Sequence, residues 1–191
     1  MSWLSSLFGG KEKSKNNESS SASTIRQGKF VAVDDAFRAW TSGDLELMLK
    51  AASTKTNPID RHFLLQSIVS EAYKRRKEDR YRQLCIEYAE KHLHEFSSLA
   101  GPLTEDMGGE LPRISTFQHY ATVLTEAEEF EKAIEICKQA IAYGLHDTHF
   151  RVLKAVLNES ERRRHRRMSN NALNTDGLGQ RAYGASPSPA G

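Results

Sequence analysis

The sequence predicts an all-α domain between disordered termini. From about Gln27 to Arg167 the apolar residues recur at the three- and four-residue spacing of amphipathic helices, and we find no convincing alternation of the kind that strands show. Only 5 prolines occur in 191 residues, and 27% of the residues are charged, which fits a helical chain facing water. No apolar run reaches the roughly 18 residues that a membrane span requires. We therefore place the helical domain at residues 27–167.

The two terminal segments, 1–26 and 168–191, are polar and rich in Ser, Asn or Gly. They bury too little apolar surface to offset the entropy cost of ordering, so we expect them to be flexible. No basic residue precedes the apolar start and no cleavage site follows it, so a secretory signal is not expected. A short apolar patch could instead form one helical face that docks on a partner or a membrane surface. Its residues are Trp3, Leu4, Leu7 and Phe8.

Two short helices are predicted at the start of the domain. The first covers about residues 34–40. Asp44 can cap the second, which ends near residue 52, because its carboxylate can accept the free amides of the first turn. Asn57-Pro58 closes this segment, and Asp60 can cap the helix that follows.

A long helix and its partner form the first predicted hairpin. The polar stretch KRRKEDR at residues 74–80 separates two helices with apolar faces, the second of which runs to about Phe96. Two helices joined by a short polar turn pack antiparallel. The inward-facing residues are Phe63, Leu64, Ile68, Ala72 and Tyr73 on the first helix and Leu84, Cys85, Tyr88, Ala89 and Leu93 on the second.

Residues 97–112, SSLAGPLTEDMGGELP, interrupt the helical period with two prolines and three glycines. We expect an irregular connection here. So long a connection is uncommon inside a compact domain and is often functional. It is either an expanded loop between two hairpins or a binding loop.

A second hairpin is predicted after this connection. Ser115 or Thr116 can cap its first helix, and Gly144 can end its second helix with a positive φ angle. Its large and small apolar residues are Phe117, Tyr120, Ala121, Leu124, Phe130, Ala133 and Ala140. A last helix, capped by Asp147 or Thr148, would cover the end of the domain. Its apolar stripe consists of Phe150, Leu153, Val156 and Leu157.

The order of large and small residues in the second hairpin resembles the tetratricopeptide repeat (TPR), a 34-residue pair of helices. The small residues let the two helices approach closely, while the aromatic and aliphatic side chains fill the space around them. Departures from the repeat are Glu128 where glycine is usual, Cys137 where an aromatic residue is usual, and Leu145 in place of proline. The hairpin at 61–96 resembles the repeat more loosely. We expect about two TPR-like hairpins with capping helices at their ends.

The resemblance implies a non-enzymatic scaffold or adaptor that binds a partner protein in a groove lined by the first helix of each hairpin. In this chain the groove residues are Ser67, Glu71, Gln118, His119 and Thr122. The Lys, Arg and Asn residues with which some family members grip a terminal carboxylate are missing at these positions. An ordinary solvated helix face would show the same polar residues, so both interpretations stay open.

The most densely charged stretch is ERRRHRR at residues 161–167. Its arginines could contact the phosphates of nucleic acid or another anionic surface, with an affinity that falls steeply as salt rises. They are Arg162, Arg163, Arg164, Arg166 and Arg167. A nucleic-acid-associated protein is therefore the alternative function, although the stretch lacks the interleaved aromatic residues of a reading module. Arginines also complement the dipole at a helix C-terminus, which is the simpler explanation.

We expect neither a cofactor nor a bound metal. The seven histidines show no zinc-like spacing with cysteine or carboxylate. Cys85 and Cys137 stand singly in apolar helical patterns, as buried cysteines of a cytoplasmic protein do. No phosphate-binding glycine loop, GxSxG, HExxH or dinucleotide fingerprint occurs. We expect no enzyme activity; the alternative is an unfamiliar active site built around residues 101–112.

Overall fold

Seven helices and one small sheet make up the part of the chain that the computed structural model describes, residues 22–145 and 154–170. In chain order they are β1 (Ser23–Arg26), β2 (Lys29–Ala32), α1 (Asp35–Ser42), α2 (Leu45–Ala51), α3 (Pro58–Lys74), α4 (Asp79–Asp106), α5 (Ser115–Glu126), α6 (Phe130–Ala142) and a C-terminal helix at 154–170. This predominance of helix confirms the predicted all-α class. Within the described ranges, no helix is both long and apolar enough to cross a membrane.

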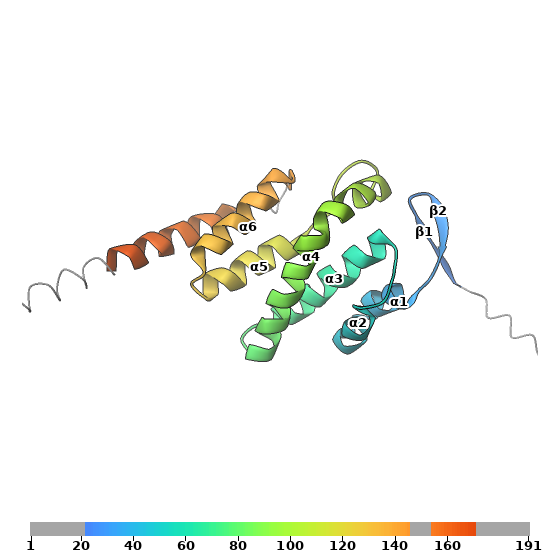
Figure 1. Ribbon diagram of the computed structural model, residues 1–191, viewed down its shortest axis with the longest axis horizontal. Coiled ribbons are helices and arrows are strands. Elements are labelled where there is room, and N and C mark those ends of the chain that lie inside the picture. The colour runs from blue at the N-terminus through green and yellow to red at the C-terminus, as the bar shows by residue number, and fades with distance from the viewer. Residues whose placement is uncertain (1–21, 146–153, 171–191) are drawn as a thin grey trace, which may run out of the picture.

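The helices are arranged as a row of neighbours (Figure 1). α1 and α2 lie at one end near the β1–β2 hairpin, α3 and α4 run antiparallel in the middle, and α5 and α6 run antiparallel beside them. The C-terminal helix lies at the opposite end. Because α3 contacts α1, α2, α4 and α5, it forms the centre of the row.

Two clusters of buried side chains form the core. The larger cluster runs from α3 through α6 and includes Val156 and Leu157 of the C-terminal helix. Cys85 and Cys137 belong to it as free, buried thiols, which confirms their predicted burial, and burial raises the pKa of each to about 12. The smaller cluster joins α1 and α2 to α3, as expected of helices that shield one end. It contains Ala36, Ala39, Leu45, Met48, Ala51, Ala52, Leu64 and Ile68.

The α5–α6 hairpin closes over small side chains, as predicted. Ala121, Ala133 and Ala140 have no exposed surface. The large side chains that surround them are at most 4% exposed; they are Phe117, Tyr120, Leu124 and Phe130. The two helices can therefore approach at the distance that small residues permit.

A strained turn joins α5 to α6. Glu128 has a φ angle of 62°, in the left-handed region that favours glycine. The Glu129 N–H donates to the Leu124 carbonyl at 2.9 Å, which closes the end of α5 in a Schellman-type motif. The left-handed conformation costs a residue with a side chain about 1–2 kcal/mol.

The C-terminal helix is attached to α5 by a buried contact. The hydroxyl groups of Thr125 and Ser160 lie 2.7 Å apart, and Ser160 has no exposed surface. Val156 and Leu157 pack against the larger cluster, in agreement with the predicted apolar stripe. The remaining predicted residues of that stripe and the predicted cap, Phe150, Leu153, Asp147 and Thr148, lie outside the described residues.

Two predictions are wrong here: that the chain has no strands, and that the ordered region begins near residue 27. β1 and β2 pair antiparallel around a two-residue turn, Gln27-Gly28, with Arg26 opposite Lys29. Both turn residues have positive φ angles, 49° and 71°, which matches the twist of a two-residue hairpin. Gln27 is an uncommon residue for such a turn, where Asn or Asp usually precedes glycine.

The predicted irregular connection at 97–112 is also wrong, because α4 continues through most of it. Leu99 and Leu103 extend the buried face of α4 and are 5% and 0% exposed. Their burial outweighs the cost of about 3 kcal/mol that a proline such as Pro102 imposes inside a helix. The helix ends where the Gly109 N–H donates to the Thr104 carbonyl at 2.8 Å.

One predicted helix cap is confirmed and one is replaced. Asp44 caps α2 as predicted, and Asp34 caps α1 in the same way by accepting the Phe37 N–H at 2.8 Å, which was not predicted. At α3 the cap is Asn57 rather than Asp60, since the Asn57 Oδ1 accepts the Asp60 N–H at 2.9 Å. Pro58 follows at the first helical position, where its missing N–H costs nothing.

The start of α5 lacks the predicted side-chain cap. Ser115 is its first residue, and its N–H donates to Oε1 of Gln66 on α3 at 2.9 Å. Thr116 is buried, and its hydroxyl lies 2.8 Å from Nδ1 of His92 on α4. Gln66 of α3 thus supplies a hydrogen-bond acceptor at the start of α5, where we had expected Ser115 or Thr116 to supply it.

Asp60 instead joins the N-terminal hairpin to the helices. Its carboxylate accepts hydrogen bonds from Arg26 at 2.6 Å, from Nε1 of Trp40 at 3.1 Å and from Nδ2 of Asn57 at 2.5 Å. Asp60 is 1% exposed. One buried carboxylate therefore links β1, α1 and the start of α3.

We expect Asp60→Ala to lower the free energy of unfolding by about 3 kcal/mol, because it leaves a largely buried guanidinium and two further donors without an acceptor. Urea unfolding followed by circular dichroism measures this loss. Asp35→Ala is the matched control, since the Asp35 side chain is 80% exposed, and it should cost less than about 1 kcal/mol. Equal losses in the two variants would contradict the linking role of Asp60.

Candidate functional site

The five predicted groove residues lie on two neighbouring helices. Ser67 and Glu71 belong to α3, while Gln118, His119 and Thr122 belong to α5, and α3 packs against α5. All five are half-buried rather than fully exposed. We call the surface that these five residues form the α3–α5 face. Its role in binding stays a prediction.

Contacts between α3 and α5 fix the geometry of this face. The ring of Tyr73 stacks on the ring of His119 with centroids 4.1 Å apart and an interplanar angle of 13°. One turn earlier on both helices, the hydroxyl groups of Ser70 and Ser115 lie 3.4 Å apart. These two contacts fix α3 and α5 relative to each other over one turn.

Two buried polar atoms on α5 have no hydrogen-bond partner among the described residues: Oε1 of Gln118 and Nδ1 of His119. A buried polar atom without a partner costs about 1–3 kcal/mol. Burial is also the main reason why the pKa of His119 falls to about 4, with Arg113, Arg76 and Lys74 lowering it further. His119 is therefore neutral at pH 7.

The other residues of the α3–α5 face differ in the hydrogen bonds that they already make within the protein. The Thr122 hydroxyl donates to the Gln118 carbonyl at 2.8 Å, and the Glu71 carboxylate accepts from Lys74. Ser67 makes no hydrogen bond with any described residue. Close by, the guanidinium of Arg76 holds both carboxylate oxygens of Glu126 at 3.1–3.2 Å.

A buried histidine pair, which the sequence analysis missed, lies behind the face. Nδ1 of His62 on α3 is 2.9 Å from Nε2 of His92 on α4, and His92 continues the chain to Thr116 on α5. Both rings have no exposed surface. Burial lowers the pKa of His62 to about 4, and burial together with His62 and Arg61 lowers that of His92 well below its usual range.

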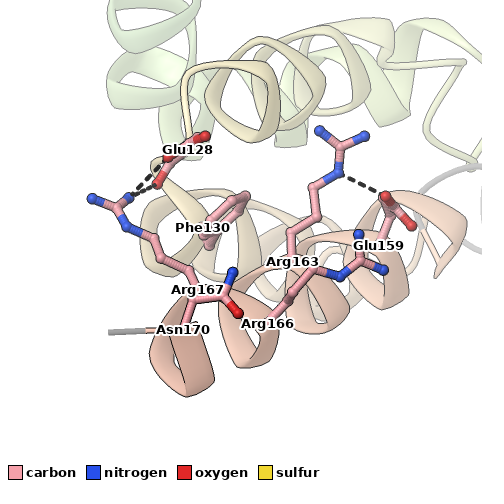
Figure 2. Close-up of a pocket in the computed structure, with 7 residues that line it drawn as sticks. All are labelled: Glu128, Phe130, Glu159, Arg163, Arg166, Arg167 and Asn170. Carbon is pink, nitrogen blue, oxygen red and sulfur yellow. Dashed lines mark hydrogen bonds and ion pairs between the residues drawn. The ribbon is translucent and has the colours of Figure 1, made fainter. Parts of the chain in front are cut away.

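The predicted arginine cluster lies on the C-terminal helix, where three of its members line a pocket (Figure 2). The pocket has a volume of about 500 Å³. Its lining residues are Glu128, Phe130, Glu159, Arg163, Arg166, Arg167 and Asn170. Figure 2 shows the Phe130 ring between Arg167 on one side and Arg163 on the other. We call it the arginine pocket.

Two of the three pocket arginines already have carboxylate partners. Nε of Arg163 donates to Glu159 at 2.6 Å, while Nη1 of Arg167 lies 3.5 Å from the Glu128 carboxylate and donates to the Glu128 carbonyl at 3.2 Å. Arg166 has no hydrogen bond or ion pair with any described residue. It adds to the positive field that lowers the pKa of Glu159, after Arg163 and Arg162.

The remaining two arginines of the cluster lie outside the pocket lining. Arg162 is exposed and 3.5 Å from Glu159, and Arg164 is half-buried with an unpaired Nε. The sequence pattern shows all five arginines as one cluster but does not identify Glu128 and Phe130 as pocket residues. Glu128 lies in the α5–α6 turn and Phe130 is the first residue of α6, far from the arginines in the sequence. The only sequence signal of the left-handed φ angle at Glu128 is that glycine is usual at this position of the repeat.

No group of three or more His, Cys, Asp or Glu side chains in residues 22–145 and 154–170 could hold a metal ion. Most of the 101–112 stretch, which was the alternative location of an active site, belongs to α4 and its C-terminal turn. The apolar patch at Trp3, Leu4, Leu7 and Phe8 lies outside the described residues.

Comparisons with protein-family models, curated proteins and solved structures found no match to this chain. The site must therefore be interpreted from its own residues.

We expect acid to destabilise the protein through the buried histidine pair. Above about pH 6.5, histidine is neutral in the folded and unfolded states, and the stability is complete. As the pH falls from 6.5 towards 4, only the unfolded chain takes up protons, so the free energy of unfolding decreases. For His62 the fall in pKa to about 4 corresponds to roughly 3 kcal/mol.

Urea unfolding between pH 7.5 and 4.5 tests this expectation. His62→Gln should show a shallower loss of stability with falling pH than the unchanged protein. His94→Gln is the control, because His94 is exposed on the same helix as His92, and its slope should equal that of the unchanged protein. A slope that His62→Gln leaves unaltered would refute the assignment.

Proposed function

We propose that this protein is a non-enzymatic scaffold of TPR-like helical hairpins that binds a partner polypeptide on the α3–α5 face. The pairing of α3 with α4 and of α5 with α6 supports the repeat interpretation, as do the buried alanines of α5 and α6. The packing of α3 against α5 brings the first helices of both hairpins together. In such scaffolds the first helices form the binding surface.

The two unpaired atoms on α5 are the observation that carries the proposal. A folded protein pairs nearly all of its buried polar groups, and exceptions tend to mark functional sites. Oε1 of Gln118 can only accept, whereas Nδ1 of His119 can accept or donate according to the tautomer. A polypeptide backbone offers both N–H and C=O groups, so it is a suitable partner for both atoms.

The surroundings favour a partner segment that is polar rather than purely apolar. The Ser67 hydroxyl group makes no hydrogen bond within residues 22–145 and 154–170, and Glu71 and Thr122 add further polar atoms to the same face. The Tyr73 ring is already engaged within the protein, because it stacks on His119 and the Arg76 guanidinium lies 4.1 Å from its centroid. Hydrogen bonds to the polar atoms would therefore fix the register of the bound segment.

Affinity purification with quantitative mass spectrometry tests the proposal. The full chain and the variant Gln118→Ala/His119→Ala are used as baits under the same conditions. Because neither changed atom has a partner among the described residues, their removal leaves none of those residues without a hydrogen bond. We expect the variant to fold normally and to recover the specific partners at least about fivefold less efficiently.

Gln139→Ala on the exposed surface of α6 is the matched control and should recover the partners as the unchanged chain does. Circular dichroism verifies that all three proteins have the same helix content. If the double variant keeps the helix content and recovers every partner equally well, the α3–α5 face is not the binding surface.

A further inference from the structure

We propose that the arginine pocket binds a compact phosphate-bearing ligand, with Arg166 as its principal contact. This site is separate from the α3–α5 face and adds a second binding function to the proposed scaffold. The lining residues come from the α5–α6 turn and the C-terminal helix (Figure 2).

The pocket side of the C-terminal helix carries a repeated pattern of polar nitrogen donors. Arg163, Arg166, Arg167 and Asn170 follow the spacing i, i+3, i+4, i+7, which places them on one stripe of the helix. Val156 lies seven residues before Arg163, so it belongs to the same stripe, and it packs against the core. The stripe is therefore apolar near the core and basic towards the C-terminal end of the helix, and covering the end of the domain requires only its apolar part.

Positive charges outnumber negative charges in the lining of the arginine pocket. Three guanidinium groups face two carboxylates, and both carboxylates already have arginine partners. Glu128 interacts with Arg167, while Glu159 interacts with Arg163 and with Arg162, which lies outside the pocket lining. Arg166 is left with its donors unused by any described residue. A guanidinium presents a planar fork of N–H groups that fits two oxygens of a phosphate at once.

The protein holds Arg167 beside the pocket at a cost in backbone energy. Glu128 contacts Arg167 through both its carboxylate and its carbonyl oxygen, while its φ angle lies in the left-handed region. Residues in this region tend to persist at binding sites, where the surrounding structure uses their geometry. Glycine would relieve the strain but would remove the carboxylate that orients Arg167.

The size and shape of the pocket favour a small ligand over a long nucleic-acid strand. A volume of about 500 Å³ lies within the range of small-molecule sites. Glu128 and Glu159 border the arginines, so a continuous phosphate backbone that crossed the pocket would meet repulsion at both edges. A single phosphate monoester, or a pyrophosphate group, can approach Arg166 and Asn170 between them.

Isothermal titration of the full chain with inorganic phosphate, pyrophosphate and adenosine monophosphate tests the proposal. The ionic strength is kept constant with sodium chloride. We expect saturable binding of at least one of these probes, and Arg166→Gln should weaken it about tenfold, as the loss of a charged hydrogen bond does. Arg38→Gln on α1 is the control and should bind like the unchanged chain, because Arg38 is exposed on a different element.

Arg166 is exposed, so Arg166→Gln should keep the unfolding midpoint of the unchanged chain. The absence of saturable binding to all three probes, or equal weakening in both variants, would overturn the proposal. A ten-nucleotide single strand distinguishes the alternative: binding that pyrophosphate cannot displace and that falls steeply with salt would assign the arginines to nucleic acid instead. Partner recovery through the α3–α5 face is unaffected by any of these outcomes.

Discussion

The close approach of paired helices over small side chains is the constraint on which the rest of the structure depends. Ala133 and Ala140 have no exposed surface, and the same is true of Ala72 and Ala89 in the α3–α4 hairpin. Where such residues lie between helices, the backbones can come near enough for the surrounding rings to fill the remaining space. This packing brings α3 beside α5 and gives the C-terminal helix a surface to rest on. Both candidate sites follow from it, because the α3–α5 face and the arginine pocket each combine residues of different helices.

The helical class, the two hairpins and the cap at Asp44 could be predicted because they depend on local information. Apolar spacing and capping residues act within a few positions of the chain. The predictions that were wrong concern elements that depend on contacts between residues distant in the sequence. α4 continues through Pro102 because Leu99 and Leu103 are buried against other helices, and this burial cannot be predicted from the neighbouring sequence. The β1–β2 hairpin is attached by Arg26 and Gln27, which reach residues more than thirty positions away in the sequence.

The candidate sites show the same division between local and distant information. The helical period could place Gln118 and His119 on one face, but only the packed structure reveals that each has a buried atom with no hydrogen-bond partner in the part of the chain that the structure describes. His62 and His92 lie on the buried faces of α3 and α4, and their spacing in the sequence does not resemble that of metal ligands. The sequence therefore did not predict that they form a pair. The arginines were evident as a cluster, whereas Glu128 in the turn that completes their pocket precedes its partner Arg167 by 39 positions. The one sequence signal of this turn was Glu128 at a place where glycine is favoured.

The most direct test of the packing constraint compares one substitution at two places on α6. Ala140→Leu forces a larger side chain into the helix contact, whereas Ala142→Leu adds the same atoms on the exposed side of the same turn. The free energy of unfolding, measured in urea, should fall by about 1–3 kcal/mol for Ala140→Leu and change by less than about 0.5 kcal/mol for Ala142→Leu. Equal stability of the two variants would show that α5 and α6 do not close over Ala140, and would contradict this account of the fold.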